Sequence, residues 1–429
     1  MSAATTAPTG TERSLSGGAL VRLVAVCGLA ITFDGYDLVV YGTTIPALMD
    51  EWDIGPAEAG TIGSYALMGM LVGALLVGSI ADQIGRRRAL IGSVVLFSAC
   101  MVVCGLAPNP TVFGAARFIG GLGLGGCMPT AAAVIVEYAP KDKRSLTYVI
   151  SQSGFAVGGI LAAGLAIPVL PQMGWRTMYF IGAAPLVIVV LPALKYLPES
   201  LEYLVAKGKH TTAAALADRL GVALPPEPTS EVERQSGPQR LFTPGFRRAT
   251  ILFWTATFCA LLLVYGLNTW LPQLMREAGY PLGSALSFLL VFNLGSIIGS
   301  LIAGPIADRI GSKPVIAVSF GLAAVCAVWL SFSPSVIPLY ILLAVGGHGA
   351  IGTQNLINPF VTGYYPAAVR STGIGWSLGI GRLGAILGPL VGGWILASSL
   401  GLEWNFYFFG VVALVGALLV SLVPRRPLT

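Results

Sequence analysis

Residues 78–88 read GSIADQIGRRR, and residues 304–314 read GPIADRIGSKP. The two stretches are offset by 226 residues, and the same offset relates GGLG at 120–123 to GGHG at 346–349. Two further matches at this offset are Pro140 with Pro366 and Arg144 with Arg370. A constant offset across several separate motifs indicates an internal repeat. The sequence therefore predicts two homologous halves, an arrangement typical of transporters in which two bundles rock about a central site.

The composition indicates what kind of protein contains this repeat. The 429 residues are 55% hydrophobic and only 10% charged, whereas soluble domains carry about 25% charged residues. Repeated apolar stretches of about 18 residues or more predict helices that cross a membrane. The composition therefore excludes a soluble globular protein and favours a membrane protein with many spans.

Apolar runs between charged or turn-forming residues predict twelve spans, each long enough to cross about 30 Å of hydrocarbon as a helix. They are 20–48, 57–81, 89–107, 111–136, 146–170, 177–197, 249–275, 282–306, 314–332, 336–361, 371–398 and 404–423. The long polar interval 198–248 contains ALPPEPTSEVERQSGPQR, whose composition is typical of disorder. The predicted fold class is an all-α membrane protein with two pseudo-symmetric six-helix bundles, 1–197 and 249–429, joined by the loop 198–248.

The distribution of basic residues predicts the orientation in the membrane. Of the 25 Lys and Arg residues, only Arg176 and Arg276 fall in predicted outer loops when the N-terminus is placed inside. The positive-inside rule then places both termini and the central loop in the cytoplasm. The net charge of +6 comes from loops at the membrane surface and does not indicate nucleic-acid binding. We expect the N-terminal tail to be cytoplasmic, because it lacks the apolar core of a signal peptide.

Several ionisable residues lie inside the predicted spans. Asp34 and Asp37 of the first span, His348 of the tenth and Arg382 of the eleventh reach similar depths near mid-membrane, and Arg117 of the fourth span lies further out. A charge at such a depth costs at least about 3 kcal/mol, so these residues normally face a cavity and pair with one another. A structural alternative stays open, in which one of the aspartates only neutralises Arg117 as a packing ion pair.

The repeat distinguishes charged residues that recur in both halves from those that occur in only one half. Asp82 recurs in the second half as Asp308, as expected of a structural position. The residues aligned with Asp34, Asp37, His348 and Arg382 are apolar or small, namely Phe258, Leu261, Leu122 and Ala156. This asymmetry favours a substrate site at the interface of the halves.

The residue types suggest a role for each group. A carboxyl group in a low-dielectric cavity can bind and release a proton near neutral pH, so Asp34 and Asp37 are the proton-coupling candidates. Arg382 is the candidate anchor for an anionic substrate, because guanidinium binds a carboxylate in bidentate geometry. His348 either carries the proton, contacts a substrate hydroxyl or only packs. Further candidate substrate contacts are Arg117, Tyr41, Tyr265, Trp270, Trp376, Asn268, Gln354 and Asn355.

The motifs carry a resemblance to a known family. GSIADQIGRRR resembles the signature loop of the major facilitator superfamily, and RFIGGLGLGG from Arg117 resembles its fourth-span motif. LPESLEYLVAKGK resembles the Pro-Glu-Ser element of its sugar and organic-ion branches. Within the superfamily, DGYD followed by LVVYGTTIPALM resembles the aromatic acid:proton symporter family, and GGHG and GRLGAILGP agree with it.

The resemblance implies a conformational latch on the cytoplasmic side. Its expected members are Asp82, Gly85, Arg86, Arg87, Glu137, Arg144 and Asp308. The alternative is that the basic residues only anchor the topology in the headgroup region.

The resemblance also implies a function. We expect a bacterial inner-membrane symporter, acting as a monomer, that imports a small aromatic carboxylate of the benzoate, hydroxybenzoate, protocatechuate or gentisate class together with protons. No other cofactor, metal or disulfide is expected, since all six cysteines lie in predicted spans. The alternatives are a transporter of another organic anion, a drug exporter, or a membrane sensor of aromatic acids. An enzyme is not expected, because no nucleophile elbow, metal-ligand cluster or cofactor motif is present.

Overall fold

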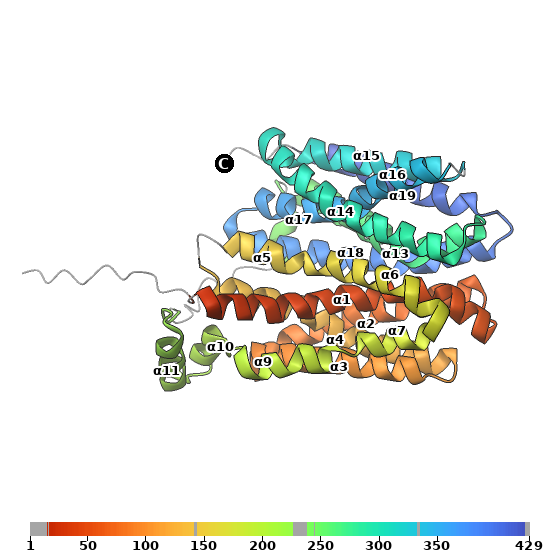
Figure 1. Ribbon diagram of the computed structural model, residues 1–429. Coiled ribbons are helices and arrows are strands. Elements are labelled where there is room, and N and C mark those ends of the chain that lie inside the picture. Colours follow the sequence, from red (N-terminus) through yellow and green to blue (C-terminus); the bar gives the residue numbers. More distant parts are fainter. Residues whose placement is uncertain are drawn as a thin grey trace, which may run out of the picture.

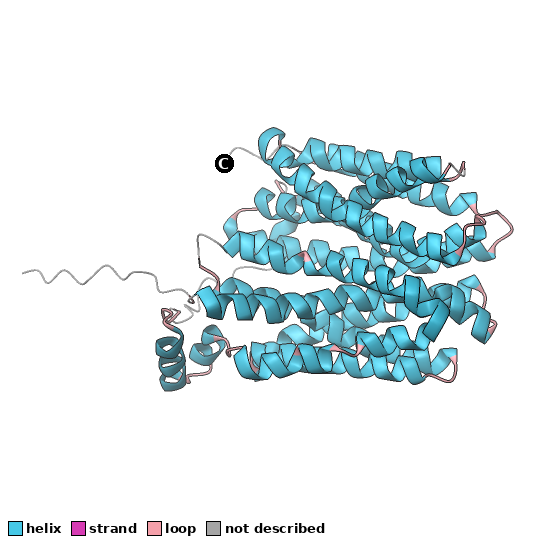
Figure 2. Cartoon of the chain, in the orientation of Figure 1, coloured by secondary structure: helices cyan, strands magenta, loops and turns pink. Residues whose placement is uncertain are grey.

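The computed structural model describes residues 15, 17–140, 144–225, 238–243, 245–332 and 335–424, and within them it places the backbone alone at 78–79, 144–146, 238 and 367–368. Helices and loops make up this described part of the chain, and it contains no strand (Figure 2). Twelve helical spans in it are long and apolar enough to cross a membrane. The predicted number of spans is therefore confirmed, and each predicted span coincides with one of them.

The first half contains six spans. Its helices are α1 Gly17–Trp52, α2 Pro56–Ile84, α3 Arg86–Leu106, α4 Pro110–Tyr138, α5 Arg144–Gln152, α6 Gly154–Met173, α7 Trp175–Gly182, α8 Pro185–Ile188 and α9 Val190–Tyr196. The fifth span is divided into α5 and α6 by a break at Ser153, and α7, α8 and α9 together form the sixth.

The second half repeats this arrangement. Its helices are α13 Arg247–Glu277, α14 Leu282–Ile310, α15 Ser312–Leu330, α16 Val336–Gly347, the π-helix η2 His348–Gly352, α17 Thr353–Tyr364, α18 Ala367–Ala397 and α19 Glu403–Ser421. The tenth span is thus one continuous helical run, α16, η2 and α17, with a π-helical turn in its middle.

The interval 198–248 carries more structure than a loop. It contains α10 Leu201–Ala206, α11 His210–Leu220 and the 3-10 helix η1 Pro238–Phe242. Figure 1 shows α10 and α11 at the end of the bundle where α1 begins. The middle of the predicted disordered stretch, 226–237, lies outside the described residues.

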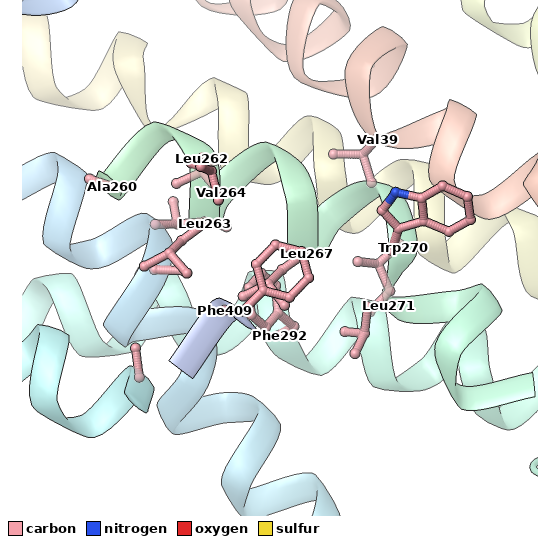
Figure 3. Close-up of a cluster of buried hydrophobic side chains, with 14 of the residues drawn as sticks. Val39, Ala260, Leu262, Leu263, Val264, Leu267, Trp270, Leu271, Phe292 and Phe409 are labelled. Atoms are coloured by element: carbon pink, nitrogen blue, oxygen red, sulfur yellow. The ribbon is translucent and has the colours of Figure 1, made fainter. Parts of the chain in front are cut away.

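The two halves pack side by side. Within them, α2 runs along α4 and α13 runs along α18, and between them α2 contacts α18, α6 contacts α14 and α1 contacts α13. Buried apolar side chains continue across this boundary. In Figure 3, Val39 of α1 lies beside Trp270 of α13, and Leu267, Phe292 and Phe409 gather next to them in the second half.

Glycines let α1 and α6 approach closely at the DGYD motif. A Cβ at Gly35 would collide with the carbonyl oxygen of Phe155, and a Cβ at Gly158 would collide with the carbonyl oxygen of Thr32. Small residues at a helix interface allow this backbone approach inside a membrane. The glycine between the two aspartates therefore holds the backbone of α6 next to Asp34.

Gly35→Ala is expected to destabilise the protein by about 1–3 kcal/mol, because the added methyl group meets rigid backbone and forces α1 and α6 apart. The apparent thermal midpoint in detergent measures the effect. Gly164→Ala is the matched control, because a Cβ there lies 3.5 Å from the Leu290 side chain, an ordinary contact distance. Equal midpoints for the two variants would contradict the packing argument.

Close contacts join the two halves along α1, α2, α13 and α18. A Cβ at Gly42 of α1 would collide with the carbonyl oxygen of Asn268 of α13. Ser64 of α2 donates a hydrogen bond of 2.8 Å to the carbonyl oxygen of Ile386 of α18. These contacts join α1 to α13 and α2 to α18 across the boundary between the two halves.

Candidate functional site

Asp34 lies at the middle of α1 and is completely buried. Neither of its carboxylate oxygens has a hydrogen-bond partner among the described residues. Asp37 and Arg382 lie within electrostatic reach of it, and Tyr265 is close to both Asp34 and Arg382. A buried carboxyl group with no partner is costly. Asp34 is therefore the group in this site most in need of a proton or a ligand.

Asp37 has a different environment. Its carboxylate accepts a hydrogen bond from Nη1 of Arg117 in a buried ion pair, and Nη2 of Arg117 donates to the Asp37 carbonyl oxygen at 3.2 Å. The guanidinium also lies 5.7 Å from the centre of the Tyr41 ring. The structural alternative for the two aspartates thus fits Asp37, which neutralises Arg117, and leaves Asp34 available for chemistry.

An aromatic cluster covers Arg117 on its outer side. Phe113 packs against Tyr41 at 6.1 Å, Trp52 at 5.4 Å and Tyr179 at 5.1 Å between ring centres. The Tyr41 hydroxyl is occupied by a hydrogen bond of 2.5 Å to the carbonyl oxygen of Ala59. Tyr41 therefore supports the ion pair through its ring face, and its buried position favours that role over direct substrate contact.

Arg382 lies at the middle of α18 and is half-buried. Among the described residues it forms no hydrogen bond or ion pair. Asp34 has the opposite charge, lies within electrostatic reach of Arg382 and also lacks a hydrogen-bond partner. Neither charged group is therefore neutralised by a direct contact. A carboxylate is the ligand that a free guanidinium binds best.

His348 begins the π-helical turn of the tenth span. Its Nε2 lies 3.0 Å from the hydroxyl of Ser319 on α15, and a Cβ at Gly299 of α14 would collide with the imidazole ring. The ring therefore lies between α14 and α15, and the structure does not bring it together with the Asp34–Arg382 group. Of the alternatives for His348, this position favours packing, although its Nδ1 has no partner among the described residues.

The predicted amide contacts are partly occupied by other residues. Asn293 donates a hydrogen bond of 3.0 Å to Asn268, which itself donates to the carbonyl oxygen of Val264 at 2.8 Å. Gln354 donates to Asn358 at 3.0 Å and keeps a free carbonyl oxygen among the described residues. Asn355 is exposed and donates to Ser300 at 3.3 Å.

Two of the aromatic residues predicted to contact substrate pack against other parts of the protein, and a third stays a candidate. Trp270 is fully buried and donates its indole N–H to the carbonyl oxygen of Pro389 at 2.8 Å. Trp376 is exposed and stacks on Trp254 at 5.7 Å. Tyr265 remains as the aromatic candidate beside Asp34 and Arg382.

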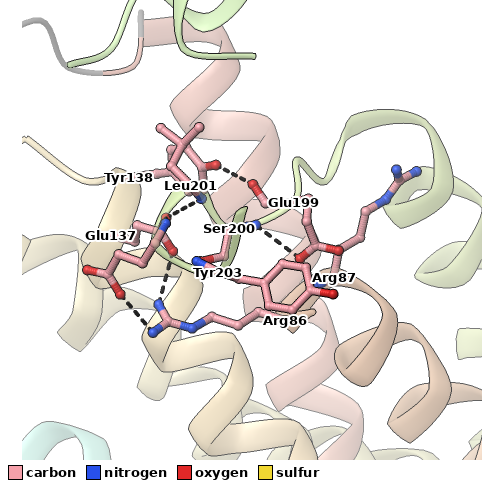
Figure 4. A network of polar contacts seen from close by, with 9 residues as sticks. Arg86, Arg87, Glu137, Tyr138, Glu199, Ser200, Leu201 and Tyr203 are labelled. Atoms are coloured by element: carbon pink, nitrogen blue, oxygen red, sulfur yellow. Dashed lines mark hydrogen bonds and ion pairs between the residues drawn. The ribbon is translucent and has the colours of Figure 1, made fainter. Parts of the chain in front are cut away.

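Residues expected in the latch form a charged network at the end of the first half where α3 begins, shown in Figure 4. Arg86 pairs with Glu137 at 2.9 Å and with Glu202 at 2.8 Å. Glu137 also accepts hydrogen bonds from the backbone N–H groups of Leu201 at 2.6 Å and of Glu202 at 3.1 Å. The network therefore ties the α2–α3 turn and the end of α4 to the start of α10.

The turn itself depends on Gly85 and Glu199. Gly85 has a φ of +99°, a conformation that favours glycine. A Cβ on it would also collide with the Glu199 carboxylate, which accepts a hydrogen bond of 3.0 Å from the backbone N–H of Arg87. Glu199 and Glu202 lie in the Pro-Glu-Ser segment, and the sequence analysis did not place them in the latch.

The structure gives no polar contact for the remaining latch candidates among the residues that it describes. Asp82 and Asp308 are exposed and form no hydrogen bond or ion pair among the described residues. The side chain of Arg144 lies outside the described part of the chain. The network in Figure 4 therefore joins elements of one half and does not join the two halves.

Asp82→Asn is expected to slow substrate transport without weakening substrate binding, because an exposed charge at the end of α2 is free to pair when the two halves move relative to each other. Uptake rate and equilibrium binding in proteoliposomes measure the two quantities separately. Asp218→Asn on α11 removes another exposed charge and serves as the control. Loss of binding in Asp82→Asn would argue against a role in the conformational change.

The Major Facilitator Superfamily model matches residues 27–296 and 253–429. The chain is 40% identical to the benzoate transport protein of Acinetobacter baylyi, over 94% of this chain and 90% of that one. It is 39% identical to the gentisate transporter of Corynebacterium glutamicum, over 95% and 88% of the two chains.

Solved structures agree on the fold. The xylose transporter XylE from E. coli, in a partially occluded inward-open conformation, matches with a TM-score of 0.75 at 18% identity and covers 95% of this chain and 98% of its own. At that identity the match establishes the arrangement of helices and nothing about the substrate. The relatives and the family model consist of transporters rather than enzymes. With its repeat and its twelve spans, the chain belongs to the major facilitator superfamily and, within it, to the family of aromatic acid transporters.

Proposed function

We propose that this protein is a secondary active symporter that imports a small aromatic monocarboxylate together with protons. The observation that carries the proposal is the pair of unpartnered, opposite charges at mid-membrane, Asp34 on α1 and Arg382 on α18. The benzoate and gentisate transporters among its relatives support the substrate class.

The chemistry follows from competition for Arg382. While Asp34 is ionised, it offers Arg382 a negative charge and disfavours a second anion nearby. Protonation of Asp34 removes that charge, so that Arg382 binds the substrate carboxylate in its place. Release of the proton on the cytoplasmic side restores the competition and expels the substrate. Rocking of the two halves about this site then exposes it to either side in turn.

Proton stoichiometry determines the driving force. One proton for each carboxylate makes transport electroneutral, so that only the pH gradient and the substrate gradient act on it. A second proton adds one net charge, on which the membrane potential acts with about 2.3 kcal/mol per 100 mV.

The setting of the protein is part of the proposal. The concentration of Lys and Arg in the even-numbered loops and in both tails supports cytoplasmic termini. The bacterial origin of the relatives supports a cytoplasmic (inner) membrane location. We propose that the protein works as a monomer and needs no cofactor besides the coupling proton.

The decisive experiment is uptake of labelled benzoate, 4-hydroxybenzoate, protocatechuate and gentisate into proteoliposomes with an alkaline interior. Wild-type protein is expected to accumulate at least one of these acids, and a protonophore is expected to abolish the accumulation. If an aliphatic monocarboxylate accumulates and no aromatic acid does, the substrate class is wrong. If an aromatic acid only equilibrates under the gradient, the proton coupling is wrong.

Arg382→Ala is expected to weaken binding of the accumulated acid by about tenfold to 150-fold, the value of a hydrogen bond to a charged group. Arg382→Lys is expected to fall between it and wild type, because lysine keeps the charge and loses the bidentate geometry. Arg276→Ala at the outer surface is the control, since its ion pair with Asp50 is long, at 3.5 Å, and exposed. Unchanged binding in Arg382→Ala would remove Arg382 from the site.

A further inference from the structure

One aromatic pair joins the two halves of the protein. Phe155 of α6 and Tyr265 of α13 meet edge to face, with ring centres 6.5 Å apart and planes at 81°. Of the ring contacts between residues that the structure describes, this is the one that crosses from the first half to the second. Both side chains are half-buried, so part of each ring is open to a further contact.

The pair lies beside the charged groups of the site. Tyr265 is within electrostatic reach of both Asp34 and Arg382. Phe155 is held at the same level by the close approach of its backbone to Gly35, the residue that follows Asp34. Phe155 is the second residue of α6, directly after the boundary with α5 at Ser153. The two rings therefore meet at the contact of α6 with α1 and α13, within electrostatic reach of Asp34 and Arg382.

This arrangement matches the two parts of an aromatic carboxylate. A carboxylate bound to Arg382 brings the substrate ring toward Tyr265 and Phe155. An edge-to-face contact uses the negative face of one ring and the positive edge of another, which a saturated ring cannot supply. The Tyr265 hydroxyl has no hydrogen-bond partner among the described residues, so it is available to a polar substituent.

We propose that Phe155 and Tyr265 form the ring-binding pair that selects aromatic carboxylates over saturated ones. When substrate binds, its ring replaces the direct contact between Phe155 and Tyr265 and packs against both side chains. This inference rests on the proposed function and adds to it the residues that determine specificity. Because the pair contains one ring from each half, a bound aromatic ring contacts both halves at once.

The test compares two acids that share a carboxylate and a six-membered ring. Benzoate and cyclohexanecarboxylate are offered as competitors in counterflow exchange, and the ratio of their half-inhibitory concentrations gives the selectivity. Wild type is expected to prefer benzoate. Phe155→Leu and Tyr265→Leu are each expected to reduce this preference about two- to tenfold, which corresponds to the energy of one aromatic pair. The change is expected because binding of benzoate becomes weaker while binding of cyclohexanecarboxylate stays the same. Tyr265→Phe keeps the ring and is expected to retain the preference.

Controls separate this inference from the function on which it rests. Phe332→Leu removes a ring that is 71% exposed and is expected to leave the selectivity unchanged. Size-exclusion chromatography of each variant establishes that it is folded. If wild type exchanges no aromatic acid, the proposed function fails. If wild type prefers benzoate and both leucine variants keep that preference, or lose both acids equally, the ring-binding pair is wrong and the transport function stands.

Discussion

Asp34→Asn is expected to abolish gradient-driven accumulation of substrate while counterflow exchange continues. Asparagine has nearly the shape of a protonated aspartate and cannot release a proton, so the variant stays in the state that admits substrate to Arg382. Exchange of labelled for unlabelled acid needs only the loaded protein to rock between its two faces, and it does not require proton release. Proteoliposomes with an imposed pH gradient measure accumulation, and the same vesicles without a gradient measure exchange.

Asp37→Asn is the matched control for this prediction, since it makes the same chemical change one helical turn away. Asp37 is already paired with Arg117, so its replacement is expected to disturb that ion pair and lower stability rather than uncouple transport. If Asp34→Asn accumulates substrate like wild type while Asp37→Asn does not, the proton role belongs to Asp37 and the assignment of Asp34 is wrong.

The arrangement of spans could be predicted from the sequence because it depends on local properties. Hydrophobic length determines where a helix crosses the membrane, and the 226-residue offset between the two ADxIG loops determines which helices correspond. The interval 198–248 was less predictable. The short helices α10 and α11 in it are held by contacts such as Glu137 to Leu201, which join residues far apart in the sequence.

For the candidate site, the sequence predicts where each residue lies along its helix but not which residues pair with one another. Position along a helix gives the depth of Asp34, Asp37 and Arg382, since each residue adds about 1.5 Å. Which aspartate meets Arg117 depends on the rotation of α1 against α4, a property of packing that a single sequence does not contain. The sequence likewise predicted that His348 lies near mid-membrane in the tenth span and could not show that its ring is directed toward Ser319.

The role proposed for Phe155 could not be predicted from the sequence. Nothing in GFAVGGILAAG distinguishes this phenylalanine from others in membrane spans. Its position becomes meaningful only when Gly35 brings α6 against the DGYD segment and α13 places Tyr265 opposite. The glycine between the aspartates was the available signal, because it indicated that another helix approaches there.

Arg117→Leu is expected to destabilise the protein by about 3–5 kcal/mol, because it leaves the Asp37 carboxylate buried without its partner. The loss includes the contact between the guanidinium and the Tyr41 ring. The double variant Arg117→Leu, Asp37→Asn removes both charges together and is expected to recover most of the lost stability, since a neutral pair of similar volume has no charge to desolvate. Apparent thermal midpoints in detergent for the wild type, the two single variants and the double variant complete a mutant cycle.

The cycle also distinguishes an ion pair that supports the fold from one that binds substrate. If Arg117 only supports the fold, the double variant regains substrate binding together with stability, because Arg382 still holds the carboxylate. If the double variant is stable and fails to bind, Arg117 contacts the substrate and Asp37 is its counter-ion in the empty site. If the two single variants and the double variant are all as stable as wild type, Asp37 and Arg117 do not depend on each other. The buried pair beneath the Tyr41 ring would then have to be maintained by selection for transport alone.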